Sequence, residues 1–195
     1  MKTSKHRYYI LKYLLTFLVL AVNTSIAQAQ SNENPNENVV YWHIKAVLPE
    51  AKLLDIKAID KEGNYYDVKA IQKSFNIDLL GIKALVNGQA IPIKMIVKED
   101  DLYYPVKAIE DDGSILDIKA IGENGELLDV KGVSRMGNIV EVRAIDKNQQ
   151  QYNVISISPD QGVNHVKGLK MFNEEVEAVI HGIKIFAHVK SLRQY

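Results

Sequence analysis

The chain has 195 residues, with 24 basic and 24 acidic side chains, and 47% of its residues are hydrophobic. It contains no cysteine, which excludes disulfide bonds, cysteine nucleophiles, cysteine-ligated zinc and the lipid-modified cysteine of a lipoprotein.

The N-terminus has the pattern of a signal peptide. Four basic residues precede an apolar run at 14–22, and Ala27-Gln28-Ala29 matches the small-x-small site of a signal peptidase. We expect residues 1–29 to be removed and the protein to be exported, to the periplasm or out of the cell. The apolar run is shorter than the ~20 residues of a membrane-spanning helix, and no other stretch is as apolar, so no transmembrane helix is expected in the mature protein.

The mature chain would be acidic. Residues 1–29 carry four basic side chains and no acidic one, so 20 basic and 24 acidic residues remain, a net charge of −4. That balance argues against nucleic acid as a partner. Residues 30–40 are polar and without periodicity, as in a disordered spacer, and 41–195 have the size of a single domain.

A short phrase recurs along this domain, most often at a spacing of 12 residues. One structural unit repeated in this way predicts a repeat fold. The copies are HIKAV (43–47), DIKAI (55–59), DVKAI (67–71), GIKAL (81–85), PVKAI (105–109), DIKAI (117–121), DVKGV (129–133), EVRAI (141–145), HVKGL (165–169) and HVKSL (188–192).

Each copy alternates polar and apolar residues and is rich in Val and Ile, which predicts a β-strand. The intervening residues predict tight turns. Three-residue loops end at Gly63, Gly113, Gly125 and Gly137, where a left-handed conformation is needed, and Asn87-Gly88 forms a two-residue loop. His181-Gly182 predicts a final two-residue turn.

The charges distinguish an antiparallel meander from a parallel solenoid. A solenoid would stack the lysines of successive copies at ~4.8 Å, which is unfavourable. Reflection about the turns of a meander gives pairs of opposite charge and places small residues opposite large ones. The expected ion pairs are Lys57–Asp67, Asp55–Lys69, Lys119–Asp129, Asp117–Lys131, Lys131–Glu141 and Asp129–Arg143; the expected apolar pairs are Ala58–Tyr66, Ala108–Leu116, Ala120–Leu128 and Ala46–Leu54.

The predicted fold is therefore all-β, an antiparallel up-and-down meander of about 12-residue strand-turn repeats. Ten or more strands rarely form one open sheet, so we expect closure as a barrel or folding as a sandwich. Pro92 and Pro105 cannot donate to a ladder, which predicts a sheet edge or a corner, with the fold-over near 88–105.

The repeated Asp and Lys residues do not predict catalysis. A catalytic couple needs an environment of its own that shifts its pKa, whereas these pairs recur on strand after strand. The sequence also contains no nucleophile motif, phosphate loop or HExxH zinc pattern. We therefore expect no enzyme and no cofactor.

Three histidines replace the aspartate of the phrase near the two ends of the domain: His43, His165 and His188. Closure of the sheet could bring them together as metal ligands. The alternative is that they are polar residues of half-exposed strands, since no carboxylate or cysteine completes a motif. We assign no metal ligand from the sequence.

Three tyrosines are candidate ligand-binding residues: Tyr41, Tyr65 and Tyr103. Alternation directs them to the charged face, and Tyr41 and Tyr65 would lie on strands two apart, ~10 Å from each other across Ile59. Such a row could stack on sugars or contact a protein partner. The alternative is cross-strand packing that covers Ile59.

An outer-membrane barrel is a further alternative, because exported meanders with alternating strands include that class. The apolar face of one unit spans ~14 Å, short of the ~25 Å band that such barrels present to lipid. Arg193 and Ser191 also stand where a terminal membrane strand would be apolar.

From Tyr41 onward the chain resembles an uncharacterised family of exported bacterial proteins built on KAI-type repeats and ending in a phrase like IHGIKIFAHVKSL (180–192). The resemblance implies export and the repeat fold, and it carries no known activity. We predict a non-enzymatic binding or structural module at the cell envelope, with a polysaccharide or an envelope protein as partner.

Overall fold

The computed structural model describes residues 39–98, 102–170 and 179–194, and this part of the chain is all-β. A short 3₁₀ turn, η2 (Pro49–Ala51), joins the first two strands. Residues 1–38, which include the predicted signal peptide, lie outside the described part. The strands are β1 (Val40–Val47), β2 (Leu53–Ile59), β3 (Tyr65–Gln72), β4 (Leu79–Val86), β5 (Gln89–Ile96), β6 (Tyr104–Ile109), β7 (Ile115–Ile121), β8 (Leu127–Met136), β9 (Ile139–Ile145), β10 (Gln151–Ile157), β11 (Val163–Lys170), β12 (Val179–Ile180) and β13 (Ile183–Leu192).

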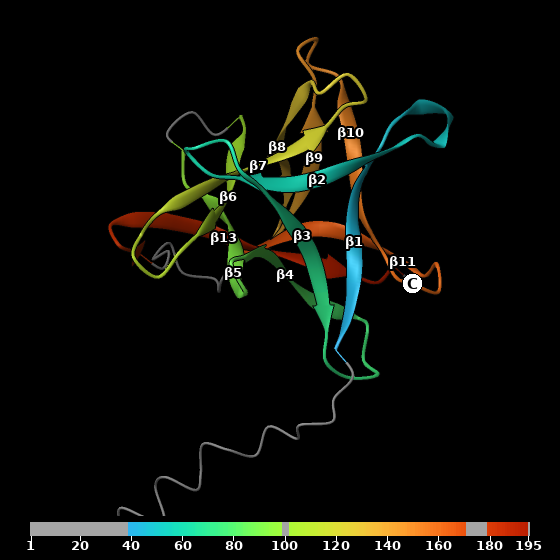
Figure 1. The fold of residues 1–195 in the computed structure, drawn as a ribbon, viewed down its shortest axis with the longest axis horizontal. Helices are drawn as coiled ribbons and strands as arrows, with labels where there is room; N and C mark the ends of the chain where they lie inside the picture. The colour runs from blue at the N-terminus through green and yellow to red at the C-terminus, as the bar shows by residue number, and fades with distance from the viewer. Residues whose placement is uncertain (1–38, 99–101, 171–178, 195) are drawn as a thin grey trace, which may run out of the picture. The chain divides into compact units, whose positions relative to one another are not determined.

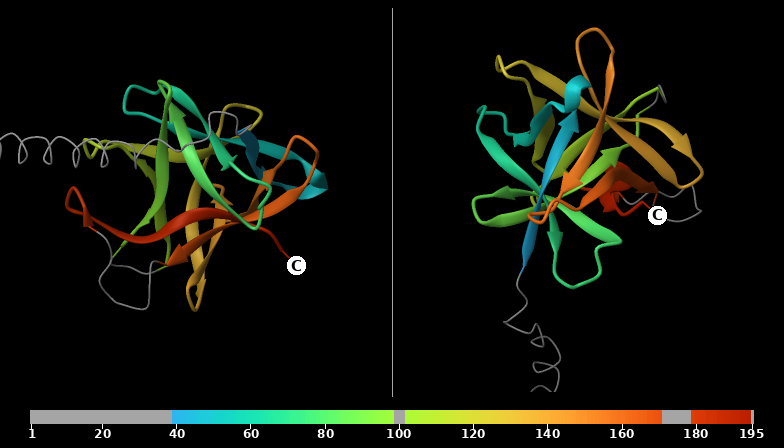
Figure 2. Two further views of the ribbon diagram at one scale, coloured as in Figure 1. Left: turned by 90° about the horizontal axis from the view of Figure 1, so that it is seen from below. Right: turned by 90° about the vertical axis from the view of Figure 1, so that its right-hand side faces the viewer.

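The strands form an antiparallel meander that closes into a barrel of twelve strands, with the short β12 paired to β13 as an extra strand. The predicted fold class is therefore confirmed, and closure as a barrel is the outcome. Figure 1 shows strands surrounding one core, and the two views in Figure 2 show strands on its other sides.

Each of the twelve strands pairs along one of its edges with two different strands, one over its first half and one over its second half. In β1, for example, residues 40–43 pair with β3 and residues 45–47 pair with β2, while β2 and β3 also pair with each other. Three strands thus form a triangle, visible at the front of Figure 1. The four triangles are triad 1 (β1, β2, β3), triad 2 (β6, β7, β8), triad 3 (β9, β10, β11) and triad 4 (β4, β5, β13).

The other edge of each strand joins its triad to a different triad. The six links are β1–β10, β2–β7, β3–β4, β5–β6, β8–β9 and β11–β13. Every triad is thereby bonded to the three others, like the corners of a tetrahedron. None of the twelve barrel strands has an open edge of the kind that promotes aggregation.

A β-branched residue marks the point on each strand where the shared edge passes from one partner to the next. In β1 this residue is Ile44, between the segments paired with β3 and β2. The twelve residues meet at the centre around a cavity of about 10 Å³, which is at the lower limit of the space that one water needs. They are Ile44, Ile56, Val68, Ile82, Ile93, Val106, Ile118, Val130, Val142, Val154, Val166 and Val189.

Small and large residues alternate around this centre. The four expected apolar pairs are confirmed: Ala46–Leu54, Ala58–Tyr66, Ala108–Leu116 and Ala120–Leu128. The alanine of each pair is fully buried, and its small side chain leaves room for the large residue opposite it.

The turns mostly follow the prediction. Gly63, Gly113 and Gly125 have φ of 86°, 89° and 77°, and both residues of the Asn87-Gly88 loop have positive φ, as a type I′ turn requires. The expected loop at 135–137 is wrong. Strand β8 continues to Met136, which pairs with Ile139, and an irregularity between Gly132 and Arg135 absorbs the shift in register.

Two of the expected ion pairs are wrong because a shared edge changes partner in mid-strand. Asp55 lies opposite Lys45 of β1 rather than Lys69, and Asp117 lies opposite Lys107 rather than Lys131. The same change puts His43 opposite Lys69.

Two further pairs fail because of the β8–β9 register. The irregularity in β8 places Lys131 opposite Arg143 rather than Glu141, and Asp129 opposite Ile145. Only Lys57–Asp67 and Lys119–Asp129 form as predicted.

The prediction that the prolines mark a sheet edge is also wrong, since β5 and β6 pair on both sides. Both prolines stand one residue before a change of partner. Strand β5 pairs with β4 through Pro92 and with β13 from Lys94, and β6 pairs with β8 through Pro105 and with β7 from Lys107. Proline lacks a backbone donor, so the point where the ladder changes partner is where it fits.

Candidate functional site

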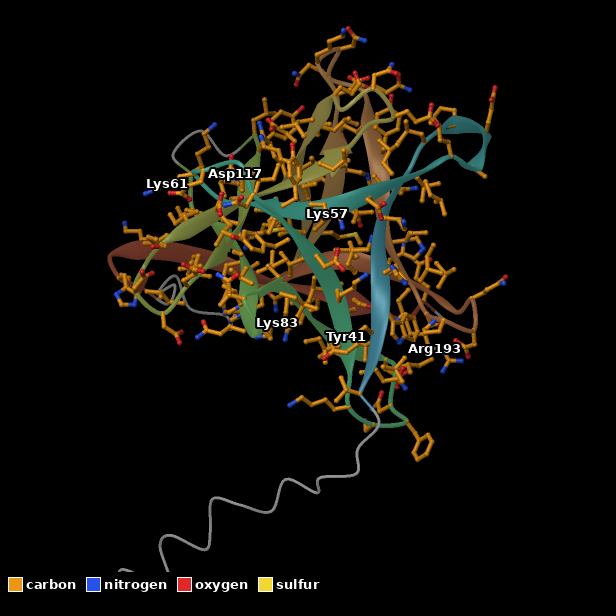
Figure 3. All side chains as sticks on the ribbon, viewed as in Figure 1. Tyr41, Lys57, Lys61, Lys83, Asp117 and Arg193 are labelled. Carbon is orange, nitrogen blue, oxygen red and sulfur yellow. The ribbon has the colours of Figure 1, made fainter. Side chains whose placement is uncertain are left out.

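The outer surfaces of triads 1, 2 and 3 carry ion pairs at equivalent positions. The residue after the central position is a lysine in ten of the twelve strands. It lies opposite the residue before the central position of another strand in the same triad, which is an acid in five strands. Lys45 meets Asp55 at 2.5 Å and Lys107 meets Asp117 at 2.5 Å, and Lys167 meets Glu141 in triad 3. Figure 3 shows the side chains on the ribbon, with Lys57 and Asp117 labelled.

Five of the six links between triads pair like charges, and the sixth, β1–β10, places Lys45 opposite Ile155. Lys57 lies opposite Lys119, Lys69 opposite Lys83, Lys94 opposite Lys107, Lys131 opposite Arg143 and Lys167 opposite Lys190. Directly opposed like charges are destabilising. The acids within the triads are therefore needed to reduce the repulsion between the two cations opposed across a link.

The three histidines lie in three different triads and are not brought together. His43 contacts Lys69 at 3.0 Å in triad 1, His165 lies opposite Ile155 in triad 3, and His188 contacts Lys94 at 2.5 Å in triad 4. Within the described ranges no group of three or more His, Asp or Glu residues is arranged to hold a metal ion.

The three tyrosines lie on the outer surface, but they do not form a row. Tyr41 lies opposite Ile71 and Tyr65 lies opposite Ile59. Ile71 is six residues from Tyr65 along β3, so the two tyrosines are about 20 Å apart rather than ~10 Å. Tyr103 directly precedes β6 of triad 2, and the ammonium group of Lys131 lies 5.6 Å from its ring centre.

Tyr65 borders a groove that the sequence did not reveal. This open groove, of about 500 Å³, runs between β2, β3 and the end of β7. Its apolar surface comes from Leu53, Tyr65 and Ile121, and the side chains of Tyr65 and Leu53 are 57% and 45% exposed. Tyr41 and Tyr103 are not part of it.

The groove also presents charged groups along its sides. Asp55 lies beside Ile121 and accepts a bond from Lys45, which lowers the pKa of the Asp55 carboxyl below its usual value. Glu123 pairs with Lys52 at 2.6 Å. A volume of this size with apolar side chains and a few polar groups is a feature of small-ligand sites.

The model of a family of unknown function, DUF7486, matches residues 38–192. The chain belongs to this family. A search of curated proteins found no match, and neither did a search of solved structures.

The matched range of the DUF7486 domain contains all thirteen strands, so the family corresponds to the complete closed fold. No helix in the described part of the chain is long and apolar enough to cross a membrane.

The groove of the DUF7486 domain was missed by sequence analysis for a geometric reason. Leu53 and Ile121 are 68 positions apart and meet only because β2 and β7 form a link between triads. The sole signal in the sequence was the pair Tyr65-Tyr66, of which alternation directs the first ring outward.

Proposed function

We propose that this protein is an exported, non-enzymatic module that binds carbohydrate in the groove beside Tyr65. The single observation that carries the proposal is the exposed face of Tyr65 in an apolar groove, on a surface whose other side chains are largely ion-paired. A sugar ring offers apolar C–H groups on its faces and hydroxyls on its rim. Tyr65 matches the first, and Asp55, Lys57 and Glu123 match the second.

The fold supports a passive role for this surface. The groove lies on paired strands rather than on long loops, so its walls are held by ladder hydrogen bonds on both sides. The outward side chains of the strands include many charged groups, whereas an outer-membrane barrel shows lipid an apolar band. These features favour a ligand-binding surface that faces water.

The test is binding of the purified mature protein to an array of cell-wall and environmental polysaccharides, without detergent. We expect saturable binding that weakens at least about tenfold in Tyr65→Ala and is largely kept in Tyr65→Phe, which retains the ring. Tyr41→Ala is the matched control, because Tyr41 is 45% exposed but lies outside the groove. Equal binding by wild type and Tyr65→Ala would refute the proposal.

Export is the second part of the proposal and has its own test. Mass spectrometry of the protein recovered from its native host is expected to give a chain that begins at Gln30 and is found in the periplasm or the medium. A full-length cytoplasmic chain would contradict it. That outcome would leave the carbohydrate experiment unaffected.

A further inference from the structure

Triad 4 departs from the charge pattern of the other triads. Lys83, Lys94 and Lys190 occupy its three cation positions, but the residues opposite them are Pro92, His188 and Gly81. Triads 1 and 2 each have two acids at the corresponding positions, and triad 3 has one. None of β4, β5 and β13 contains an acidic residue. Triad 4 therefore gathers three cations without a counter-charge on its own strands.

The three ammonium groups are close enough to repel one another. Burial, Lys83 and Lys190 lower the pKa of Lys94 to about 8, and burial, Lys190 and Lys73 lower the pKa of Lys83. A Cβ atom built on Gly81 would lie 3.9 Å from Nζ of Lys190, so this ammonium group occupies the space that an aspartate side chain takes in the equivalent position elsewhere. Lys83 is labelled in Figure 3.

Hydrogen bonds do not offset this repulsion. Among the described residues, Lys83 and Lys190 make no hydrogen bond or ion pair, and the side chain of Lys94, 7% exposed, bonds only to His188. Burial and the three lysines lower the pKa of His188 to about 4, so its ring is neutral near pH 7. The ammonium group of Lys94 lies 2.5 Å from Nδ1 and 3.4 Å from Nε2 of this ring.

The acids of the neighbouring triads do not offset the charge of triad 4 either, because they are paired with cations of their own triads. Lys69, Lys107 and Lys167 lie opposite Lys83, Lys94 and Lys190, and each is paired with an acid of its own triad. The acid nearest in sequence to β4, Asp78, contacts Arg193 at 3.7 Å. The outer surface of triad 4 therefore offers ammonium donors and positive charge, and its three strands carry no carboxylate.

We propose that triad 4 binds a tetrahedral oxyanion, a phosphate or sulfate group, through the ammonium groups of Lys83, Lys94 and Lys190. A ligand for a donor-only site must be an acceptor, and these two groups carry oxygen acceptors in all directions. Three donors around the pseudo-threefold axis of a triad match three oxygens of one tetrahedral group, whereas a carboxylate has only two. The group could be a free ion or an ester, and this site is independent of the Tyr65 groove.

The first experiment is calorimetric titration of the mature protein with inorganic phosphate, sulfate and acetate at constant ionic strength, together with the melting temperature in each anion. We expect phosphate or sulfate to bind and to raise the melting temperature, since a ligand of the native state stabilises it. Acetate should have a smaller effect. Absence of both binding and a shift for phosphate and sulfate would overturn the proposal.

Three variants assign the effect to triad 4. Lys190→Met should weaken anion binding at least about tenfold. Lys119→Met is the matched control, because Lys119 occupies the same position in triad 2 but is paired with Asp129. Gly81→Asp restores the acid of the other triads beside Lys190, so it should abolish the anion response while keeping the fold; only this ammonium group lies within 4 Å of the added Cβ. Equal anion responses in wild type, Lys190→Met and Gly81→Asp would refute the assignment.

A final titration separates the sources of the group. Glycerol 3-phosphate and a sulfated monosaccharide are compared with the inorganic ions in the wild type. Tighter binding of either compound would identify an ester as the ligand. Tighter binding of the inorganic ions would identify a free oxyanion. The ¹H–¹⁵N signals of the His188 ring should shift on binding in each case.

Discussion

Met95 determines the identity of two glycines on other strands. Most repeats have a small residue such as alanine after the lysine, but β8 and β11 have Gly132 and Gly168 there. A Cβ on Gly168 would lie 2.5 Å from Sδ and Cε of Met95, and one on Gly132 would lie 2.9 Å from Sδ. Met95 is fully buried, so its side chain has little room to move away. The two glycines are thus required by one long side chain in triad 4.

This packing predicts a compensating pair of substitutions. Gly168→Ala should lower the free energy of unfolding by about 1–3 kcal/mol through overpacking, and Met95→Ala should lower it by about 2–5 kcal/mol through a cavity. The double variant should lose less than the sum, because the added methyl group enters the space that Met95 leaves. Chemical denaturation of the four proteins measures this coupling. Strict additivity would show that the two side chains do not compete.

Two side chains of triad 4 should make stability depend on pH at both ends of the range. The pKa of His188 is about 4, below its ordinary value, so the unfolded chain binds more protons and stability falls as the pH drops from about 6.5 to about 4. The pKa of Lys94 is about 8, so stability rises as the pH increases from about 8 to about 10.5. Each slope is at most about 1.4 kcal/mol per pH unit for one proton.

The measurement is the free energy of unfolding of wild type, His188→Gln and Lys94→Met across pH 4–10.5. His43 and His165 also have lowered pKa values, so the acid slope of wild type contains their contributions as well. The difference between wild type and His188→Gln isolates one histidine. An unchanged acid slope in His188→Gln would contradict the prediction, as would an unchanged alkaline slope in Lys94→Met.

At the scale of elements, the acids of the triads differ in how many cations they serve. Asp129 contacts both Lys119 and Lys131, at 2.9 Å for the second, while Asp117 contacts Lys107. Both cations of Asp129 lie opposite another cation across a link, Lys57 for Lys119 and Arg143 for Lys131. Asp129 thus reduces repulsion along two links, β2–β7 and β8–β9.

Asp129→Asn should therefore be more destabilising than Asp117→Asn. We expect about 1 kcal/mol for the first and about half of that for the second at low salt, as for partly exposed ion pairs. The difference should shrink in 1 M NaCl because salt screens the repulsion. Urea denaturation at two salt concentrations measures it, and a difference that does not change with salt would contradict an electrostatic cause.

The sequence allowed the strands and most turns to be predicted, because alternation and turn glycines are local signals. Ala58 opposite Tyr66 and Lys57 opposite Asp67 were correct for the same reason, since both pairs flank one hairpin. The pair Asp55–Lys69 was wrong because reflection about a turn assumes one partner along the whole edge. The partner of Asp55 is set by the three-strand triangle, which is a tertiary property.

The candidate sites were less accessible to prediction. Tyr65 was identified from alternation, but its neighbours in the groove come from β7, and pairing of β2 with β7 has no local signal. The absence of acids from triad 4 becomes apparent only when β4, β5 and β13 are known to form one triangle, and the sequence does not show that they do. Gly81, Pro92 and His188 looked like unrelated exceptions to the repeat.

For the whole molecule, the tetrahedral connection of the triads distinguishes this protein from a linear array of repeats. Units of a solenoid contact only their neighbours, and such arrays often unfold in parts. Here each triad is bonded to the three others, and one β-branched residue of each of the twelve strands contributes to a single centre. Loss of any triad would expose edges and core of all the others.

We therefore expect the domain to unfold in one cooperative transition. In differential scanning calorimetry the calorimetric and van't Hoff enthalpies should agree, and fluorescence of Trp42, in triad 1, should change together with the far-UV signal. A substitution at the centre, such as Val142→Ala in triad 3, should lower the midpoint seen by both probes equally. Separate midpoints for the two probes would show that the triads unfold independently.

The near identity of the twelve strands has a consequence for folding kinetics. A strand such as DIKAI at 55–59 resembles the one at 117–121 so closely that either could pair in the place of the other, and such exchanges would be kinetic traps. The exceptions to the repeat reduce this ambiguity. A strand with alanine in place of glycine would be overpacked against Met95, and the side chain of Asn164 donates to the carbonyl of Ile77 and to the hydroxyl of Ser191. These few irregular residues favour one order of assembly among many that the repeated phrase alone would permit.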